Sequence, residues 1–107
     1  MPEKTLLLKA LGDSPGLRIV DFFLENRSDY SKKEIVQSAG MSKTTFYKVW
    51  KELEAFRIVR KTRQYGRAQL YALNIGNPVV KKMMALDWTL GRQAMESAPA
   101  KIKQSIV

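Results

Sequence analysis

The feature that most constrains the fold is a break of only three residues, GMS, between two helical segments. Upstream of it, Ser31 is followed three residues later by Glu34, a capping box that predicts a short helix beginning at residue 32. Gly40 ends that helix, because glycine tolerates the left-handed backbone of a sharp turn. Ser42 offers the N-cap of a second helix, which we expect to run to about residue 56. Two helices joined so closely predict a helix-turn-helix.

The second of these helices has two unlike faces. Its apolar residues recur at intervals of three and four, which predicts that one face is buried against the rest of the domain. These residues are Phe46, Val49, Trp50, Leu53 and Phe56. The other faces carry Lys43, Thr44, Thr45, Tyr47, Lys48 and Lys51.

The part of the chain before this motif is expected to be helical. Residues 4–11 form an apolar segment that predicts a short helix. Ser14 can cap a second helix, with Pro15 at its first position. Residues 26–30 are polar and predict a turn.

The part that follows the motif changes its periodicity. Residues 58–64 and 68–74 read as two strands, with residues 65–67 at the tip of a hairpin. Asn77, with a proline after it, predicts the start of a final helix that ends near residue 97. The predicted fold class is mainly α with a two-stranded β-hairpin. We expect an N-terminal helical segment over residues 1–13, a central domain over 14–76, a C-terminal helix over 77–97 and a polar tail over 98–107.

Composition restricts the possible chemistry. The chain has 107 residues, which fits one compact domain. It has no cysteine and no histidine, so disulfides, thiolate chemistry and the commonest metal ligand and general base are excluded. No apolar run approaches the roughly 20 residues that span a bilayer, and the N-terminus lacks a secretion signal. We therefore expect a cytoplasmic protein.

The positive charge is concentrated in one part of the chain. The net charge is +9, and residues 42–69 carry eight basic and two acidic residues, a net charge of +6. Residues 1–41 carry six of each and are neutral overall. A clustered basic patch is typical of a protein that binds a polyanion, although it also fits a merely solvated basic surface.

The order and spacing of these elements resemble those of the winged helix-turn-helix transcription regulators, in the broad ArsR and MarR group and its archaeal relatives. The matching stretch is KKEIVQSAGMSKTTFYKVWKELEAFRIVRKTRQYGRAQLYAL, residues 32–73. In this group the hairpin is the wing. One position departs from the pattern, because Arg57 stands where these proteins usually have glycine after the second helix. A left-handed arginine there costs about 1 kcal/mol or more.

The resemblance implies that the chain binds double-stranded DNA and associates with the nucleoid. The start of the second helix would enter the major groove, where lysines suit phosphates or guanine and threonines suit phosphates or thymine. The arginines of the wing would contact the minor groove or flanking phosphates, and the alternative is an edge strand protected by charge. The candidate DNA-binding residues are Ser42, Lys43, Thr44, Thr45, Tyr47, Lys48, Lys51, Arg57, Arg60, Lys61, Arg63 and Arg67.

The final helix is too apolar for one domain to cover, since it carries two apolar stripes. We expect a homodimer through this helix, with the N-terminal segment as a second contributor. In the alternative, that segment packs on the helix within one chain. A two-fold dimer would place its recognition helices about 34 Å apart on DNA. The candidate interface residues are Leu7, Leu8, Val79, Val80, Met83, Met84, Leu86, Trp88 and Leu90.

Other classes of function are less well supported by the residues. Glu52 and Glu54 point to different faces of a helix, and Asp21 and Glu25 fit a surface role, so we predict no catalytic residue, no cofactor and no metal. No inducer site can be recognised. A plasmid partition, replication or architectural chromatin protein fits the sequence as an alternative to a regulator.

Overall fold

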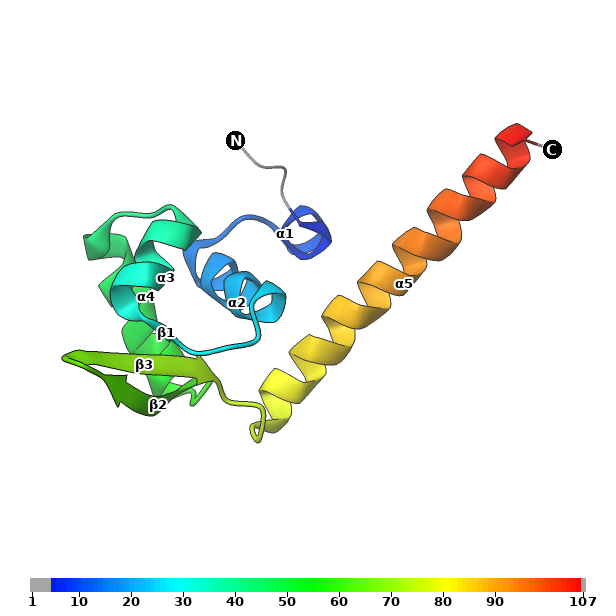
Figure 1. Ribbon diagram of the computed structural model, residues 1–107. Coiled ribbons are helices and arrows are strands. Elements are labelled where there is room, and N and C mark those ends of the chain that lie inside the picture. Colours follow the sequence, from blue (N-terminus) through cyan, green and yellow to red (C-terminus); the bar gives the residue numbers. More distant parts are fainter. Residues whose placement is uncertain (1–4, 107) are drawn as a thin grey trace.

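The computed structural model describes the backbone of residues 5–106 and the side chains of residues 5–96; the first four residues of the expected N-terminal segment and residue 107 of the expected tail lie outside this range. The elements in chain order are α1 (Leu6–Leu11), α2 (Pro15–Glu25), β1 (Tyr30–Ser31), α3 (Lys32–Ala39), α4 (Lys43–Ala55), β2 (Val59–Tyr65), β3 (Ala68–Leu73) and α5 (Pro78–Ile106). Helices α2, α3 and α4 and the sheet gather into one body, and α5 leaves it as a single long helix (Figure 1). The predicted class, a mainly helical winged helix-turn-helix with an extra C-terminal helix, is confirmed.

The helix ends form where the sequence places them. The hydroxyls of Ser14, Ser31 and Ser42 each accept a hydrogen bond from the backbone amide three residues on, at 3.1, 3.2 and 3.2 Å. Glu34 closes the capping box by accepting from the backbone amide of Ser31 at 2.9 Å. Gly40 adopts the left-handed conformation, with φ of 67°, and so turns the chain from α3 into α4.

The sheet corrects the expectation of a two-stranded hairpin. In the described residues it has three antiparallel strands in the order β1-β3-β2, with Tyr30 opposite Tyr71 and Ser31 opposite Leu70. Two residues are too few to show a strand periodicity, and the second of them also caps α3. The extra strand ties the wing to the segment that precedes the helix-turn-helix.

The core fixes the orientation of α4. Phe46 and Trp50 are 0% and 1% exposed, which confirms their predicted burial. Their rings stack at 5.1 Å between centroids, and Tyr71 of β3 meets Trp50 edge-on, also at 5.1 Å. The helix is therefore held by its back against the sheet, so that its other faces point outward.

Phe56, by contrast, was wrongly predicted to be buried. It is 70% exposed, because α4 ends one residue before it and the chain then turns through a left-handed residue at Arg57. Ile58, the residue after the turn, is buried instead.

The C-terminal helix differs from the expectation in its length. α5 continues beyond residue 97, through Pro99, to Ile106, so residues 98–106 of the expected polar tail are helical. A proline in a helix interior removes one backbone donor and crowds the preceding turn, which is why the helix was expected to end before Pro99. Near its start, α5 packs against α1, which also packs against α2. The N-terminal segment thus contacts the final helix within one chain.

Candidate nucleic-acid interface

The outward face of α4 carries most of the predicted recognition residues. The exposed residues are the capping residue Ser42 and, on the helix itself, Lys43, Thr44, Tyr47, Lys48 and Lys51. Thr45 is half-buried, and its hydroxyl accepts a hydrogen bond from the hydroxyl of Ser42 at 3.1 Å. Thr45 is therefore part of the helix cap, while the other side chains are directed to solvent.

Lys32, at the first position of α3, joins this face and was missed in the sequence. Its Nζ lies 5.5 Å from the ring centroid of Tyr47, 5.4 Å from that of Tyr71 and 5.9 Å from that of Trp50. These distances allow cation–π attraction, which brings a positive charge beside the exposed Tyr47. A lysine at the positive end of a helix is electrostatically unfavourable, and that is the signal that could have identified it.

Arg18 of α2 fixes the turn that precedes the recognition helix, and it too was missed. Its guanidinium donates to the carbonyl oxygens of Ala39 and Gly40, at 3.4 and 3.0 Å. Asp13 holds the same guanidinium through two hydrogen bonds of 2.6 and 3.2 Å. The end of α3 is thereby anchored to α2, which sets the direction in which α4 begins.

The wing presents its cations on β2 and at the turn that follows. Gly66 supplies the positive φ of 63° that the turn between β2 and β3 needs. The pairing of β2 with β3 is irregular between Lys61 and Gln64, where the register shifts. Arg60, Lys61 and Arg67 are exposed, and no ion pair joins them to an acidic residue within the described part of the chain. These three remain free to meet an anion.

Arg63 differs from the other wing cations. Asp29, from the loop before β1, accepts hydrogen bonds from Nε and Nη2 of Arg63 at 2.9 and 3.3 Å. Thr62 donates to the same carboxylate at 2.7 Å. The hydrogen bonds from Arg63 and then from Thr62 lower the pKa of Asp29 to about 2. Arg63 is therefore part of an ion pair that ties β2 to the loop before the helix-turn-helix.

Arg57 takes the conformation that its position demands. Its φ is 58°, the one positive value for a non-glycine residue among those described. The amide of Ile58 bonds to Leu53 O at 2.9 Å and that of Arg57 to Glu54 O at 3.0 Å, the two bonds of a Schellman motif. Asn74 donates to Arg57 O at 2.9 Å, which helps to hold a turn that costs free energy in arginine.

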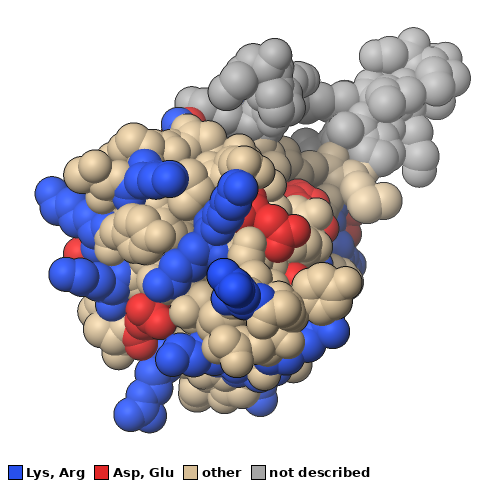
Figure 2. Space-filling view, turned by 60° about the vertical axis from the view of Figure 1, so that its left-hand side comes forward, with Lys and Arg blue, Asp and Glu red and all other residues tan. Residues whose placement is uncertain are grey.

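Basic side chains predominate on the side of the molecule that carries the helix-turn-helix and the wing. Figure 2 shows the side that carries α3, α4 and the sheet in Figure 1, and Lys and Arg side chains outnumber Asp and Glu on it. Helix and wing thus combine into one basic surface, as a long polyanion requires.

The candidate interface residues of α1 and α5 divide into two groups. Leu7 and Val80 are 2% and 0% exposed, so they belong to the core of the single chain and cannot form an open interface. They are buried because α1 and the start of α5 pack on each other and on the body. Leu8, Met83, Met84 and Leu90 are half-buried, whereas Val79, Leu86 and Trp88 are exposed.

The described residues offer no group of three or more Asp, Glu, His or Cys side chains that could hold a metal ion. Among the helices described, none has both the length and the apolar character needed to cross a membrane.

Comparison with known proteins places the fold. No protein-family model matches the chain, and no curated protein matches it either. Among solved structures it is similar to NadR in complex with 4-hydroxyphenylacetate, with a TM-score of 0.62 and 14% identity over 94% of this chain and 72% of that one. It is also similar to a MarR-family transcriptional regulator from Silicibacter pomeroyi, with a TM-score of 0.55 and 16% identity over 92% of this chain and 74% of that one. For Sso10a-2, a DNA-binding protein from Sulfolobus solfataricus, the TM-score is 0.50 and the identity 13%, over 85% of this chain and 95% of that one. The chain therefore has the winged helix-turn-helix fold of the regulators and DNA-binding proteins to which it is similar.

Proposed function

We propose that this chain is a sequence-specific, double-stranded DNA-binding transcription regulator. The observation that carries the proposal is the two-faced α4: its back is buried through Phe46 and Trp50, while its exposed front is basic and polar. The fold it shares with NadR and the Silicibacter regulator supports the same conclusion.

In this proposal α4 lies in the major groove, where its first residues, Lys43 and Thr44, read base edges. Tyr47 and Lys48 contact phosphates or bases farther along the groove, and Lys32 adds a charge beside them. The wing contacts flanking backbone or the minor groove through Arg60, Lys61 and Arg67, as expected for exposed cations next to a recognition helix. Arg63 contributes mainly by positioning the wing, because its guanidinium is already paired.

We further propose that two copies form a homodimer through α5. The helix extends beyond the body of the domain and exposes Val79, Leu86 and Trp88 on its surface. Exposed apolar side chains along a protruding helix favour helix–helix association. A two-fold dimer would present two copies of α4 to one near-palindromic site.

The experiment that tests sequence reading starts from a random pool of duplexes, from which bound sequences are enriched and sequenced. Affinity is then measured for the enriched duplex and for a scrambled one. Lys43→Ala or Thr44→Ala should lose about 1–3 kcal/mol on the enriched duplex and relax the preference at particular base pairs. The matched variant Arg67→Ala should weaken both duplexes nearly alike. If the wing variant alone abolishes the preference, the roles of helix and wing are reversed; if nothing is enriched, sequence-specific recognition is refuted.

A second candidate is a partition, replication or architectural DNA-binding protein. The similarity to Sso10a-2, which is described only as a DNA-binding protein, supports it. A genome-wide occupancy profile separates the two candidates. Peaks at a few promoters favour a regulator, whereas one cluster at an origin or partition locus, or broad coverage, favours the second candidate.

A further inference from the structure

An irregularity in the wing brings three side chains together. Thr62 and Arg63 of β2 both stand opposite a single residue of β3, Leu70, because the strand pairing shifts there. In a regular strand two successive side chains point to opposite faces of the sheet, whereas an extra residue of this kind re-aims one of them. Thr62 and Arg63 can therefore both reach the same partner, which is Asp29.

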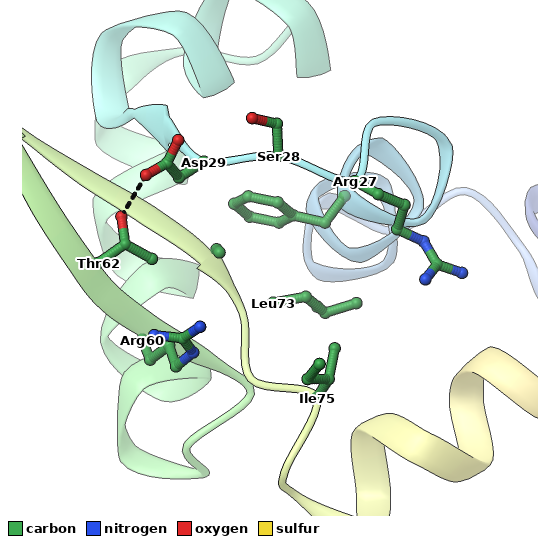
Figure 3. Close-up of a pocket in the computed structure, with 9 residues that line it drawn as sticks. Arg27, Ser28, Asp29, Arg60, Thr62, Leu73 and Ile75 are labelled. Carbon is green, nitrogen blue, oxygen red and sulfur yellow. Dashed lines mark hydrogen bonds between the residues drawn. The ribbon is translucent and has the colours of Figure 1, made fainter.

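Asp29 is held in place beside the wing. It directly precedes β1, whose pairing with β3 fixes this loop to the sheet. Figure 3 shows its carboxylate facing Thr62, which donates to it at 2.7 Å, while Arg60 of the same strand lies apart from it. The side chain of Asp29 is 14% exposed, whereas that of Arg63 is 65% exposed. The anion is thus built into the body, and the cation projects into solvent.

The carboxylate of Asp29 takes the donors that a phosphate would use. Arg63 presents Nε and Nη2 to its two oxygens, in the forked arrangement by which guanidinium groups also bind phosphate. The hydroxyl of Thr62 adds a third donor, as hydroxyl groups do in contacts with DNA backbone. A phosphate that approaches Arg63 must displace Asp29, whose effective concentration is high because both residues belong to one chain.

We propose that Asp29 is an internal competitor of the DNA backbone, which withholds Arg63 from phosphate and so limits the affinity of the wing for DNA of any sequence. The proposal rests on the proposed function, in which Arg60, Lys61 and Arg67 of the same wing meet DNA. Phosphate contacts carry no sequence information, so the limit applies to every duplex alike. A purely structural pair predicts the opposite sign, because loss of Asp29 would loosen the wing and weaken binding.

The first test measures the affinity of Asp29→Asn for the enriched and the scrambled duplex. Release of one cation should raise both affinities by the same factor, about three- to tenfold, and steepen the salt dependence by about one. Glu25→Gln, which removes one negative charge at an exposed position of α2, is the control and should raise them by clearly less. An affinity that is unchanged or lower in a folded Asp29→Asn variant would refute the proposal.

The Arg63→Gln background separates the release of Arg63 from a general gain in positive charge. In that background Asp29→Asn has no cation to free, so its gain should disappear; an equal gain in both backgrounds would refute the proposal.

Arg63→Lys is an independent variant that keeps Asp29. A lysine lacks the two-point fit to a carboxylate, so its charge should be released more easily and the chain should bind duplex more tightly than the unaltered one. A thermal melt checks that each variant is folded. Where Asp29→Asn is unfolded, the absence of a gain in Arg63→Lys would refute the proposal.

A second polyanion separates this proposal from the proposed function. Immobilised heparin carries sulfate groups and no base pairs, so elution from it by salt does not depend on DNA binding. Asp29→Asn should elute at a higher sodium chloride concentration than the unaltered chain, and the shift should be absent in the Arg63→Gln background. That shift without any duplex binding would count against the proposed function alone, whereas duplex binding without a gain from Asp29→Asn would count against this proposal alone.

Discussion

The side-chain amide of Asn77 donates a hydrogen bond of 2.8 Å to the carbonyl oxygen of Arg57, and so joins the start of α5 to the turn that ends the recognition helix. The same nitrogen donates to Phe56 O at 3.0 Å, while Oδ1 accepts from the backbone amide of Val79 at 2.9 Å. One side chain thus caps α5 and satisfies carbonyl groups beyond α4. The position of the proposed DNA-reading helix is tied in this way to that of the proposed dimer helix.

Replacing Asn77 by Asp tests this link. The variant keeps the acceptor for Val79 but loses the donors to Phe56 and Arg57, and it places a negative charge against their carbonyl oxygens. We expect the free energy of unfolding to fall by about 1–3 kcal/mol, measured by urea denaturation. For Asn77→Ser, which also retains a cap acceptor, the free energy of unfolding should fall by less. An unchanged stability in the aspartate variant would show that the link does not stabilise the fold.

Replacing Arg57 by Gly should separate stability from affinity. Glycine adopts the left-handed backbone without strain, so the free energy of unfolding should rise by up to about 1 kcal/mol. DNA affinity should fall, because a cation next to the wing is lost. Arg57→Lys, which keeps both the charge and the strain, should change neither quantity appreciably. Urea denaturation measures the stability, and titration with a DNA duplex measures the affinity, of the unaltered chain and the two variants. If Arg57→Gly is more stable but binds DNA with unaltered affinity, Arg57 is not part of the DNA interface.

The Asp29–Arg63 pair predicts a specific dependence on acid. The pKa of Asp29 is lowered to about 2, from about 3.9 in an unfolded chain. A carboxyl group with a lowered pKa stabilises the fold above its unfolded value, and this contribution is lost as the pH falls from about 4 towards 2. Asp29→Asn lacks the contribution at every pH, so its stability should fall less steeply over that window.

Arg63→Gln removes the same ion pair from the other side and serves as the matched variant. Urea denaturation between pH 2 and 5 should show a flatter curve for both substitutions, and the effect should be smaller for Arg63→Gln because Thr62 still donates to Asp29. If either variant loses stability with acid as steeply as the unaltered chain, Asp29 and Arg63 do not form the pair in solution.

A charge on the exposed face of α5 should prevent the proposed dimer. Trp88 is 62% exposed, with the guanidinium of Arg92 5.0 Å from its ring centroid. Trp88→Glu should give a monomer of 12.2 kDa in sedimentation equilibrium at micromolar concentration, while the unaltered chain gives a dimer. Gln37→Glu, which adds a negative charge at an exposed position of α3 outside the proposed interface, is the control and should stay dimeric. An unaltered chain that sediments as a monomer would end the dimer proposal.

The features that the sequence predicted well are local in the chain. The caps at Ser14, Ser31 and Ser42, the turn at Gly40 and the buried face of α4 depend on residues within four positions of one another, where spacing and propensity decide the outcome. Phe56 was the exception. The apolar spacing of α4 continues to residue 56, although the helix ends before it, and the left-handed turn at Arg57 leaves the Phe56 side chain exposed.

The features that the sequence could not predict arise between distant segments. The pairing of β1 with β3 joins residues about forty positions apart, and Asp29 meets Arg63 across 34. A charge count along the chain cannot detect a carboxylate that reaches the wing only in the folded state. The cluster around Lys32 likewise brings together side chains of α3, α4 and β3. Sequence reasoning therefore placed the elements of the site but could not distinguish the free cations from the paired one.

The measurement that tests the central proposal most directly is the salt dependence of duplex binding, followed by fluorescence anisotropy. If each protomer neutralises six or so phosphates, the logarithm of the affinity should fall against the logarithm of the salt concentration with a slope of about −5. Arg67→Ala should reduce the magnitude of that slope by about 1, because one phosphate contact is lost. Binding that is absent at low salt, or that does not respond to salt, would contradict the assignment of this chain as a DNA-binding protein.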